Sequence, residues 1–184
     1  ELVKKNAGQI TIIGDEPRPA YDRVHLSEYF AGKTAADLAM GTRELYAEWG
    51  VTLHTGTRVT AINRAAKTVS CDDGREFGYD KLVLATGSYP FVPPISGNDR
   101  EGCLVYRTIE DLEAITAQAA KSKIGVVVGG GLLGLEAANA LAQLGLETHV
   151  VEFAPRLMAV QLDSEGGAML RRKNEALGIR VHTS

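Results

Sequence analysis

The chain has 184 residues, of which 45% are hydrophobic and 23% charged, and its formal net charge is −3. This length is enough for one or two domains with a buried core. The slightly acidic balance excludes general attraction to nucleic acid or to an anionic membrane surface. The longest nearly uncharged apolar run, residues 124–135, is shorter than the roughly 18 residues of a membrane-spanning helix, so we expect no transmembrane segment.

The N-terminal stretch predicts part of a larger unit. Residues 1–8 resemble the last turn of a helix and a connection, and residues 9–13 a short strand ended by Gly14 and Asp15. A helix tail without a beginning implies a missing N-terminal strand. Further on, residues 43–49 predict a short helix with Thr42 as N-cap and Gly50 as its stop.

After this helix the sequence consists of short runs rich in β-branched residues. Between residues 51 and 85 these runs are interrupted by the turn sequence DDGRE, which predicts a β-meander followed by a buried strand at residues 82–85. That strand leads into Thr86 and Gly87, where small residues let the backbone approach another group closely.

The C-terminal part alternates regularly. Thr108 and Asp111 fit a capping box that opens a helix, and we place a domain boundary near residue 105. Beyond this helix, strands are predicted at 124–128, 147–152 and 179–183, and helices at 132–144 and 163–177. Such alternation indicates an α/β fold with a parallel sheet covered by helices.

A glycine-rich motif joins the first of these strands to its helix. Gly129, Gly131 and Gly134 form G-x-G-x-x-G directly after the strand, which is the context of a dinucleotide-binding fingerprint. Gly129 permits the tight turn, Gly131 lets a pyrophosphate approach the helix N-terminus, and Gly134 allows close helix–strand packing.

An acidic residue completes the fingerprint. Glu152 ends the next strand, where a carboxylate binds the ribose 2′-hydroxyl and repels a 2′-phosphate. The sequence therefore favours NADH over NADPH. One alternative is that the glycines only let the helix pack on the strand and that Glu152 is a solvated strand end. A separate question is Arg156 in the following loop, which is either a solvated charge or a contact for a phosphate that would weaken the exclusion of NADPH.

The cysteines and histidines of this sequence do not have the spacing of a redox or metal site. Cys71 and Cys103 form neither a CxxC pair nor a metal-ligand pattern, and we read them as unpaired thiols of a cytoplasmic protein. The four histidines, His25, His54, His149 and His182, lack ligand spacing as well. The sequence predicts no metal site in this chain.

Longer stretches resemble a known family. The ATG turn at 85–87, placed after a meander and before the GxGxxG segment, resembles the FAD- and NAD(P)H-dependent pyridine nucleotide reductases, which are flavoproteins with two dinucleotide-binding domains. The stretches DEPRPAYDRVHLSEYF, YDKLVLATGSYPFVPPI, VYRTIEDL, GGGLLGLEAANAL and HVVEFAPRLMAVQLD closely resemble the N-terminal flavoprotein part of nitrite reductase large subunits. The resemblance implies a partial FAD domain at 1–105 and a partial Rossmann-like NAD(P)H domain at 106–184.

The resemblance also implies FAD-binding residues. Asp15, with Glu16 as substitute, takes the place of the acid that binds the FAD ribose, Val59 meets the adenine through its main chain, and Thr86 and Gly87 line the site. Structural roles are the alternative for two of these residues: Asp15 as a turn former after the strand, and Val59 as a core residue of the meander.

Two arginines and two glutamates each allow two readings. Arg23 and Arg107 are candidates near the flavin phosphate or ring, or else solvated charges. Ferredoxin-reductase-like relatives carry a flavin-side lysine where this chain has Glu28, so the usual pair with Glu136 cannot form. Glu136 then faces the flavin–nicotinamide interface or is a simple polar helix residue. No cysteine lies in this loop, which argues against a disulfide substrate.

The function implied by the resemblance is oxidation of NADH by FAD, with electrons passed on to a metal centre. No side chain needs to be catalytic, because the cofactors carry the chemistry. Iron–sulfur clusters and sirohaem need clustered ligands, so they are expected only in an absent C-terminal region that reduces nitrite to ammonia. The resemblance is compatible with a small partner subunit and a homodimer. The alternatives are a stand-alone FAD reductase for ferredoxin or rubredoxin, and a redox-silent nucleotide-binding interaction protein.

Overall fold

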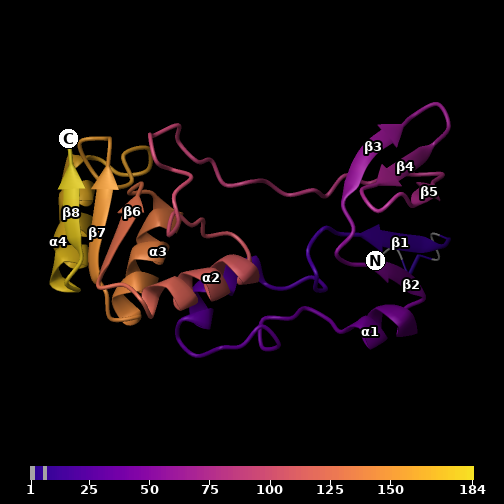
Figure 1. The fold of residues 1–184 in the computed structure, drawn as a ribbon, viewed down its shortest axis with the longest axis horizontal. Helices are drawn as coiled ribbons and strands as arrows, with labels where there is room; N and C mark the ends of the chain where they lie inside the picture. Colours follow the sequence, from indigo (N-terminus) through magenta and orange to yellow (C-terminus); the bar gives the residue numbers. More distant parts are fainter. Residues whose placement is uncertain (1–2, 6–7) are drawn as a thin grey trace. The chain divides into compact units, whose positions relative to one another are not determined.

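The computed structural model describes residues 3–5 and 8–184, which divide into two compact units (Figure 1). The first unit comprises residues 1–22 and 36–88, and the second comprises 23–35 and 89–184. The helix tail predicted at residues 1–8 depends on residues 1–2 and 6–7, which lie outside the described part. The domain boundary near residue 105 stays a prediction.

The first unit contains a small parallel sheet and one short helix. Strand β1 (Ile10–Ile13) pairs in parallel with β2 (Val51–His54), and α1 (Arg43–Glu48) precedes β2. The Thr42 hydroxyl accepts a hydrogen bond from the backbone three residues on, and Gly50 turns the chain with φ +68°. The predicted helix, its N-cap and its stop are therefore confirmed.

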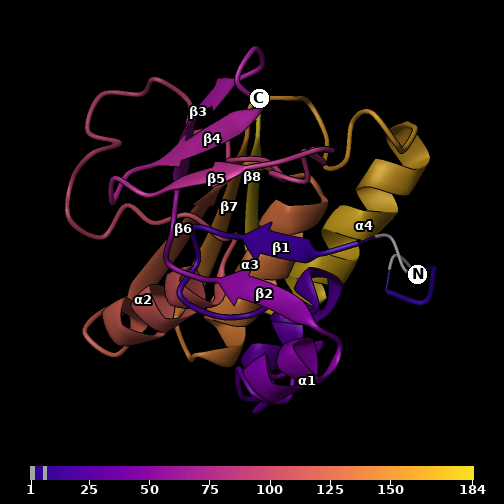
Figure 2. The ribbon, with the colours of Figure 1, turned by 90° about the vertical axis from the view of Figure 1, so that its right-hand side faces the viewer.

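A three-stranded antiparallel meander follows. Strands β3 (Val59–Asn63), β4 (Thr68–Cys71) and β5 (Glu76–Gly78) lie side by side, as Figure 2 shows. The predicted meander is confirmed, but it does not include residues 51–54. Those residues form β2, which pairs with β1, a strand far away in the sequence, and not with β3, the next strand along the chain.

The strand predicted at residues 82–85 is wrong. This segment is irregular, and Val83 and Leu84 are 76% and 66% exposed. A strand needs a neighbour for its backbone N–H and C=O groups, and no described strand pairs with this segment. An apolar, β-branched composition alone does not supply that partner.

The second unit begins with two helical segments. A 3-10 segment, η1 (Arg23–Tyr29), comes first, and α2 (Ile109–Ala119) follows much later. The Thr108 hydroxyl accepts from the Asp111 backbone at 3.2 Å, and the Asp111 carboxylate accepts from the Thr108 backbone at 2.8 Å. The predicted capping box is confirmed and defines where α2 begins.

The rest of the second unit is the alternating segment. Its elements are β6 (Ile124–Val128), α3 (Leu132–Gln143), β7 (Glu147–Glu152), α4 (Ser164–Ala176) and β8 (Arg180–Thr183). The strands are parallel, as predicted, and they lie in the order β6-β7-β8 (Figure 1). Strands added in one direction through right-handed crossovers place both helices on the same face of the sheet.

That helix-covered face carries the core of the unit. Ala138 from α3 packs with Val150, Leu157, Ile179 and Val181, all at most 4% exposed. Burial of each large aliphatic side chain stabilises the fold by roughly 1.5–3 kcal/mol. The core holds the carboxyl ends of β6 and β7 beside the start of α3. None of the described helices is long and apolar enough to cross a membrane.

Candidate functional site

The turn between β6 and α3 leaves a helix N-terminus free. Gly129 adopts φ +117°, which a residue with a side chain rarely does, and its backbone donates to Val151 O at 2.8 Å. Gly131 is the N-cap of α3 and provides no side-chain cap. The first backbone N–H groups of α3 thus have no capping partner from the N-cap side chain, and together with the helix dipole they favour an anion.

The glycines of this turn differ in the space around them. A Cβ at Gly134 would lie 2.0 Å from the Gly129 carbonyl oxygen, whereas a Cβ at Gly131 would meet nothing within 4 Å. A Cβ at Gly130 would lie 2.6 Å from Leu157 and 3.0 Å from Glu152 Cβ. Gly134 therefore serves close packing, and the open space lies at Gly131.

Gly130 is a residue of this turn to which the motif analysis assigned no role. The motif explains the first and third of the three consecutive glycines, and the structure supplies the reason for the middle one. Its backbone N–H donates to the Glu152 carboxylate at 2.6 Å, and its carbonyl accepts from Met158 N at 2.9 Å. Three glycines in a row were the only sequence signal for this role.

The Glu152 carboxylate lies at the carboxyl end of β7, against the glycine turn. One oxygen accepts from Gly130 N and the other from Ala154 N at 2.7 Å. These bonds fix the carboxylate beside the open start of α3. A carboxylate held there matches the place of a ribose-binding acid.

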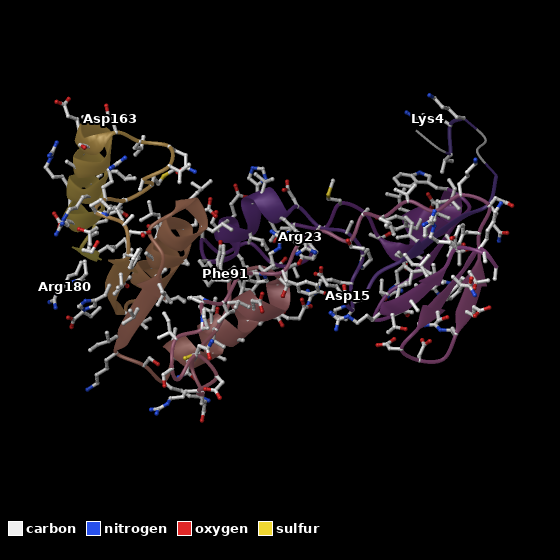
Figure 3. All side chains as sticks on the ribbon, turned by 90° about the horizontal axis from the view of Figure 1, so that it is seen from above. Lys4, Asp15, Arg23, Phe91, Asp163 and Arg180 are labelled. Atoms are coloured by element: carbon white, nitrogen blue, oxygen red, sulfur yellow. The ribbon has the colours of Figure 1, made fainter. Side chains whose placement is uncertain are left out.

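The loop after Glu152 is braced internally. Arg156 donates from Nε to Leu162 O at 3.0 Å and from Nη2 to Ala159 O at 3.1 Å. The guanidinium is half-buried and braces its own loop, so Arg156 is not a freely solvated charge. Asp163, labelled in Figure 3, caps α4 by accepting from Gly166 N at 2.8 Å.

Glu136 lies in α3, close to a buried phenol. Burial, and secondly the charge of Glu136, raise the pKa of Tyr106 to about 12. The Tyr106 hydroxyl is buried and has no hydrogen-bond partner among the described residues, and its ring stacks on Phe30 at 6.3 Å. Glu136 is thus part of a half-buried environment, although its role toward a cofactor stays a prediction.

Glu28, the residue that departs from the ferredoxin-reductase pattern, has a lysine partner of its own. Its carboxylate forms an ion pair with Lys33, and its carbonyl oxygen accepts from the Lys33 backbone at 3.1 Å. The turn that follows η1 therefore supplies a local cation to Glu28.

The predicted FAD-side residues of the first unit lie around the end of β1. The Asp15 carboxylate, labelled in Figure 3, lies 3.9 Å from Arg58, and both side chains are about half exposed. Glu16 accepts from the Tyr21 hydroxyl at 2.6 Å. Val59 begins β3 and is 39% exposed, so the structure brings Asp15 and the start of β3 together through Arg58.

Thr86 and Gly87 lie in the irregular segment that replaces the predicted strand. Gly87 has φ +65°, a conformation that favours glycine and agrees with a turn. Both residues are exposed. The structure gives the turn but not the strand that was expected to deliver it.

The structure brings Arg23 and Arg107 together in the second unit. The Arg23 guanidinium donates to the Arg107 carbonyl at 3.1 Å, and the Arg107 backbone donates to Asp111 at 3.0 Å. This links η1 to the start of α2. A role of either arginine toward a flavin stays a prediction.

Two of the histidines form a pair across neighbouring strands. His149 Nδ1 lies 2.9 Å from His182 Nε2, and His149 Nε2 lies 3.3 Å from the Glu147 carboxylate. Among the described residues no group of three or more His, Cys, Asp or Glu side chains could hold a metal ion.

A parallel α/β sheet whose glycine turn meets a helix N-terminus and a strand-end carboxylate defines a dinucleotide-binding protein. The family model for "Pyridine nucleotide-disulphide oxidoreductase" matches residues 1–184. The chain belongs to this family, which implies binding of FAD and NAD(P)H.

Two relatives with high sequence identity are large subunits of nitrite reductases. The chain is 58% identical over 175 residues to the large subunit of NADH nitrite reductase from Escherichia coli K12, covering 95% of this chain. It is 58% identical over 176 residues to the NAD(P)H nitrite reductase large subunit of Klebsiella oxytoca, covering 96% of this chain. It spans only 21% and 18% of these two relatives.

A solved structure with the same fold is an NAD-dependent persulfide reductase from A. fulgidus. The TM-score is 0.91 at 29% identity, over 100% of this chain and 36% of that one. The fold class expected from the sequence, an α/β flavoprotein with partial dinucleotide-binding domains, is confirmed by these matches.

The residues of the glycine turn fit a nicotinamide dinucleotide. The open space at Gly131, the α3 N-terminus without a side-chain cap and the fixed Glu152 carboxylate are the three features that such a ligand needs. In the first unit, the half-exposed Asp15 carboxylate beside the start of β3 suits a ribose hydroxyl.

Proposed function

We propose that this chain is the NADH-oxidising flavoprotein module of a nitrite reductase, with residues 1–105 as FAD domain and 106–184 as NAD(P)H domain. The observation that carries the proposal is the 58% identity to a nitrite reductase large subunit over 95% of the chain. Bound NADH and FAD supply hydride transfer and one-electron delivery. The protein's own residues bind and orient these groups.

Each part of the glycine turn has a role in this proposal. The α3 N-terminus binds the pyrophosphate next to Gly131, Gly129 turns the chain, and Gly134 keeps the helix close to the sheet. Glu152 binds the ribose 2′-hydroxyl and disfavours a 2′-phosphate, so NADH is preferred over NADPH. Its bond to Gly130 N holds the carboxylate in place for this.

Further residues are proposed for the flavin side, and none of them is proposed as catalytic. In the first unit, Asp15 or Glu16 is proposed to bind the FAD ribose, Val59 to meet the adenine through its main chain, and Thr86 and Gly87 to line the site. In the second unit, Arg23, Arg107 and Glu136 are proposed only as candidate contacts of the cofactors.

The rest of the reaction belongs to chain outside these residues. We propose that iron–sulfur and sirohaem centres in the longer protein receive the electrons and reduce nitrite to ammonia in the cytoplasm. A small subunit and a second copy of the large subunit are the proposed protein partners. The relatives' greater length leaves room for those centres.

The deciding experiment uses the full-length protein that contains this chain. It is reduced anaerobically with NADH while its visible spectrum is recorded, and nitrite is then added. Flavin and sirohaem bands that bleach with NADH and return with nitrite are the expected result. A flavin band that bleaches alone and ignores nitrite indicates a stand-alone reductase for a small iron–sulfur protein, and a flavin that NADH does not bleach indicates a redox-silent protein.

A further inference from the structure

Arg75, in the turn between β4 and β5, is bonded to several groups of the first unit. Its Nη1 lies 3.1 Å from His54 Nδ1, its Nη2 donates to Thr57 Oγ1 at 2.5 Å, and its Nε donates to Asp73 Oδ2 at 2.7 Å. The guanidinium also lies 5.7 Å from the centre of the Phe77 ring. Arg75 therefore joins the meander to the end of β2 and the segment that follows it.

Thr57 is the buried residue of the segment joined in this way. Thr57 is 1% exposed, and its backbone donates to Gly14 O at 2.9 Å. Its hydroxyl donates to Thr55 O at 3.3 Å and accepts from Arg75. The His54 ring itself lies 4.8 Å from the Phe77 ring, so the meander touches both ends of this short connection.

The same connection leads directly to the proposed FAD residues. Gly14, which accepts from Thr57, precedes Asp15 in the chain. Arg58, the next residue after Thr57, lies 3.9 Å from the Asp15 carboxylate, and Val59 begins β3. A displacement of residues 54–57 would shift both Asp15 and the start of β3.

We propose that Arg75 and His54 are positioning residues for the adenosine end of the FAD site, with the His54 ring accepting a hydrogen bond from the Arg75 guanidinium. The proposal rests on the FAD-binding function proposed above. Neither residue touches FAD in it; they act by holding residues 54–57, and thereby Asp15 and Val59, in place.

The direction of this hydrogen bond follows from the available donors. Arginine has only N–H donors, so His54 Nδ1 must accept the bond from Arg75. A side chain at position 54 without an acceptor atom therefore cannot make this contact.

The groups around this contact keep Arg75 charged and in place. The hydrogen bond from Arg75 lowers the pKa of Asp73, so its carboxylate stays ionised, and the bond to Asp73 raises the pKa of Arg75 further. Burial raises the pKa of the Cys71 thiol, which stays neutral. Arg43 from α1, bonded to Thr55, is always charged.

The test measures FAD affinity of the full-length protein by the rise of flavin fluorescence on dissociation. His54→Asn keeps an acceptor oxygen near the position of Nδ1. His54→Phe keeps a ring against Phe77 and has no acceptor. Arg75→Gln removes the guanidinium, and circular dichroism confirms that each variant is folded.

We expect His54→Phe and Arg75→Gln to lower FAD affinity about tenfold, as for the loss of one charge-assisted hydrogen bond. His54→Asn should keep wild-type affinity because it keeps the acceptor. Wild-type affinity in folded His54→Phe or Arg75→Gln would overturn the proposal, as would a tenfold loss in His54→Asn. A wild-type protein that binds no FAD refutes the proposed function itself.

Discussion

The substitution Gly134→Ala separates packing from ligand binding in the glycine turn. The added methyl would lie 2.0 Å from the Gly129 carbonyl oxygen, which is 1 Å short of the 3.0 Å below which Cβ atoms are essentially never found. The clash is with backbone, so α3 must move away from β6. Overpacking by one methyl costs about 1–3 kcal/mol, and a rigid neighbour places this case near the upper end.

Gly131→Ala is the matched control, because its methyl meets nothing within 4 Å and its φ of −83° suits alanine. Alanine is a poorer N-cap than glycine by roughly 0.5 kcal/mol, but it restricts the unfolded chain and regains about 0.4–1 kcal/mol. Stability should therefore stay nearly unchanged. NADH affinity should fall, since the methyl fills the space proposed for the pyrophosphate.

The assay combines two measurements on the full-length protein. Hydrogen exchange at the amides of β6 and α3 reports the local free energy of opening, and quenching of NADH fluorescence on titration reports affinity. We expect Gly134→Ala to lower both protection and affinity, and Gly131→Ala to lower affinity alone. Unchanged protection in Gly134→Ala would refute the packing argument, and unchanged affinity in Gly131→Ala would refute the placement of the pyrophosphate.

Three further predictions concern single side chains. Glu152→Gln should weaken NADH binding about tenfold, through loss of a charge-assisted bond, and NADPH binding less; an unchanged ratio of the two dissociation constants would remove Glu152 from the site. Thr108→Ala should lower the unfolding free energy by about 1 kcal/mol, with Thr108→Ser restoring it in urea denaturation. The folded pKa of Tyr106 is raised from 10.0 to about 12, so the unfolding free energy should fall as the pH rises across that interval. Tyr106→Phe removes a buried hydroxyl that has no hydrogen-bond partner among the described residues. This substitution should reduce the loss at high pH without lowering the unfolding free energy at neutral pH.

The sequence alone predicted the elements whose causes are local. The caps Thr42 and Thr108 act on backbone groups within a few residues, and the alternation after residue 120 reflects faces buried against one core. The spacing of Gly129, Gly131 and Gly134 was equally readable, because a turn followed by a helix needs these glycines at fixed offsets.

Features that need a partner distant in the sequence were decided only by the tertiary structure. β2 pairs with β1 across some forty residues, and the apolar run at 82–85 forms no strand because no described strand lies beside it. The crowding at Gly130 comes partly from Leu157, which no spacing rule connects with it.

Two arginines show the same difference between what the sequence predicts and what the tertiary structure decides. Composition identifies Arg75 and Arg156 only as cations, but the structure bonds one to His54 and Thr57 and the other to the carbonyls of its own loop. Local propensity and periodicity act over a few residues and can be read from the chain itself. Hydrogen bonding and packing between distant segments depend on how those segments meet, and only folding determines that.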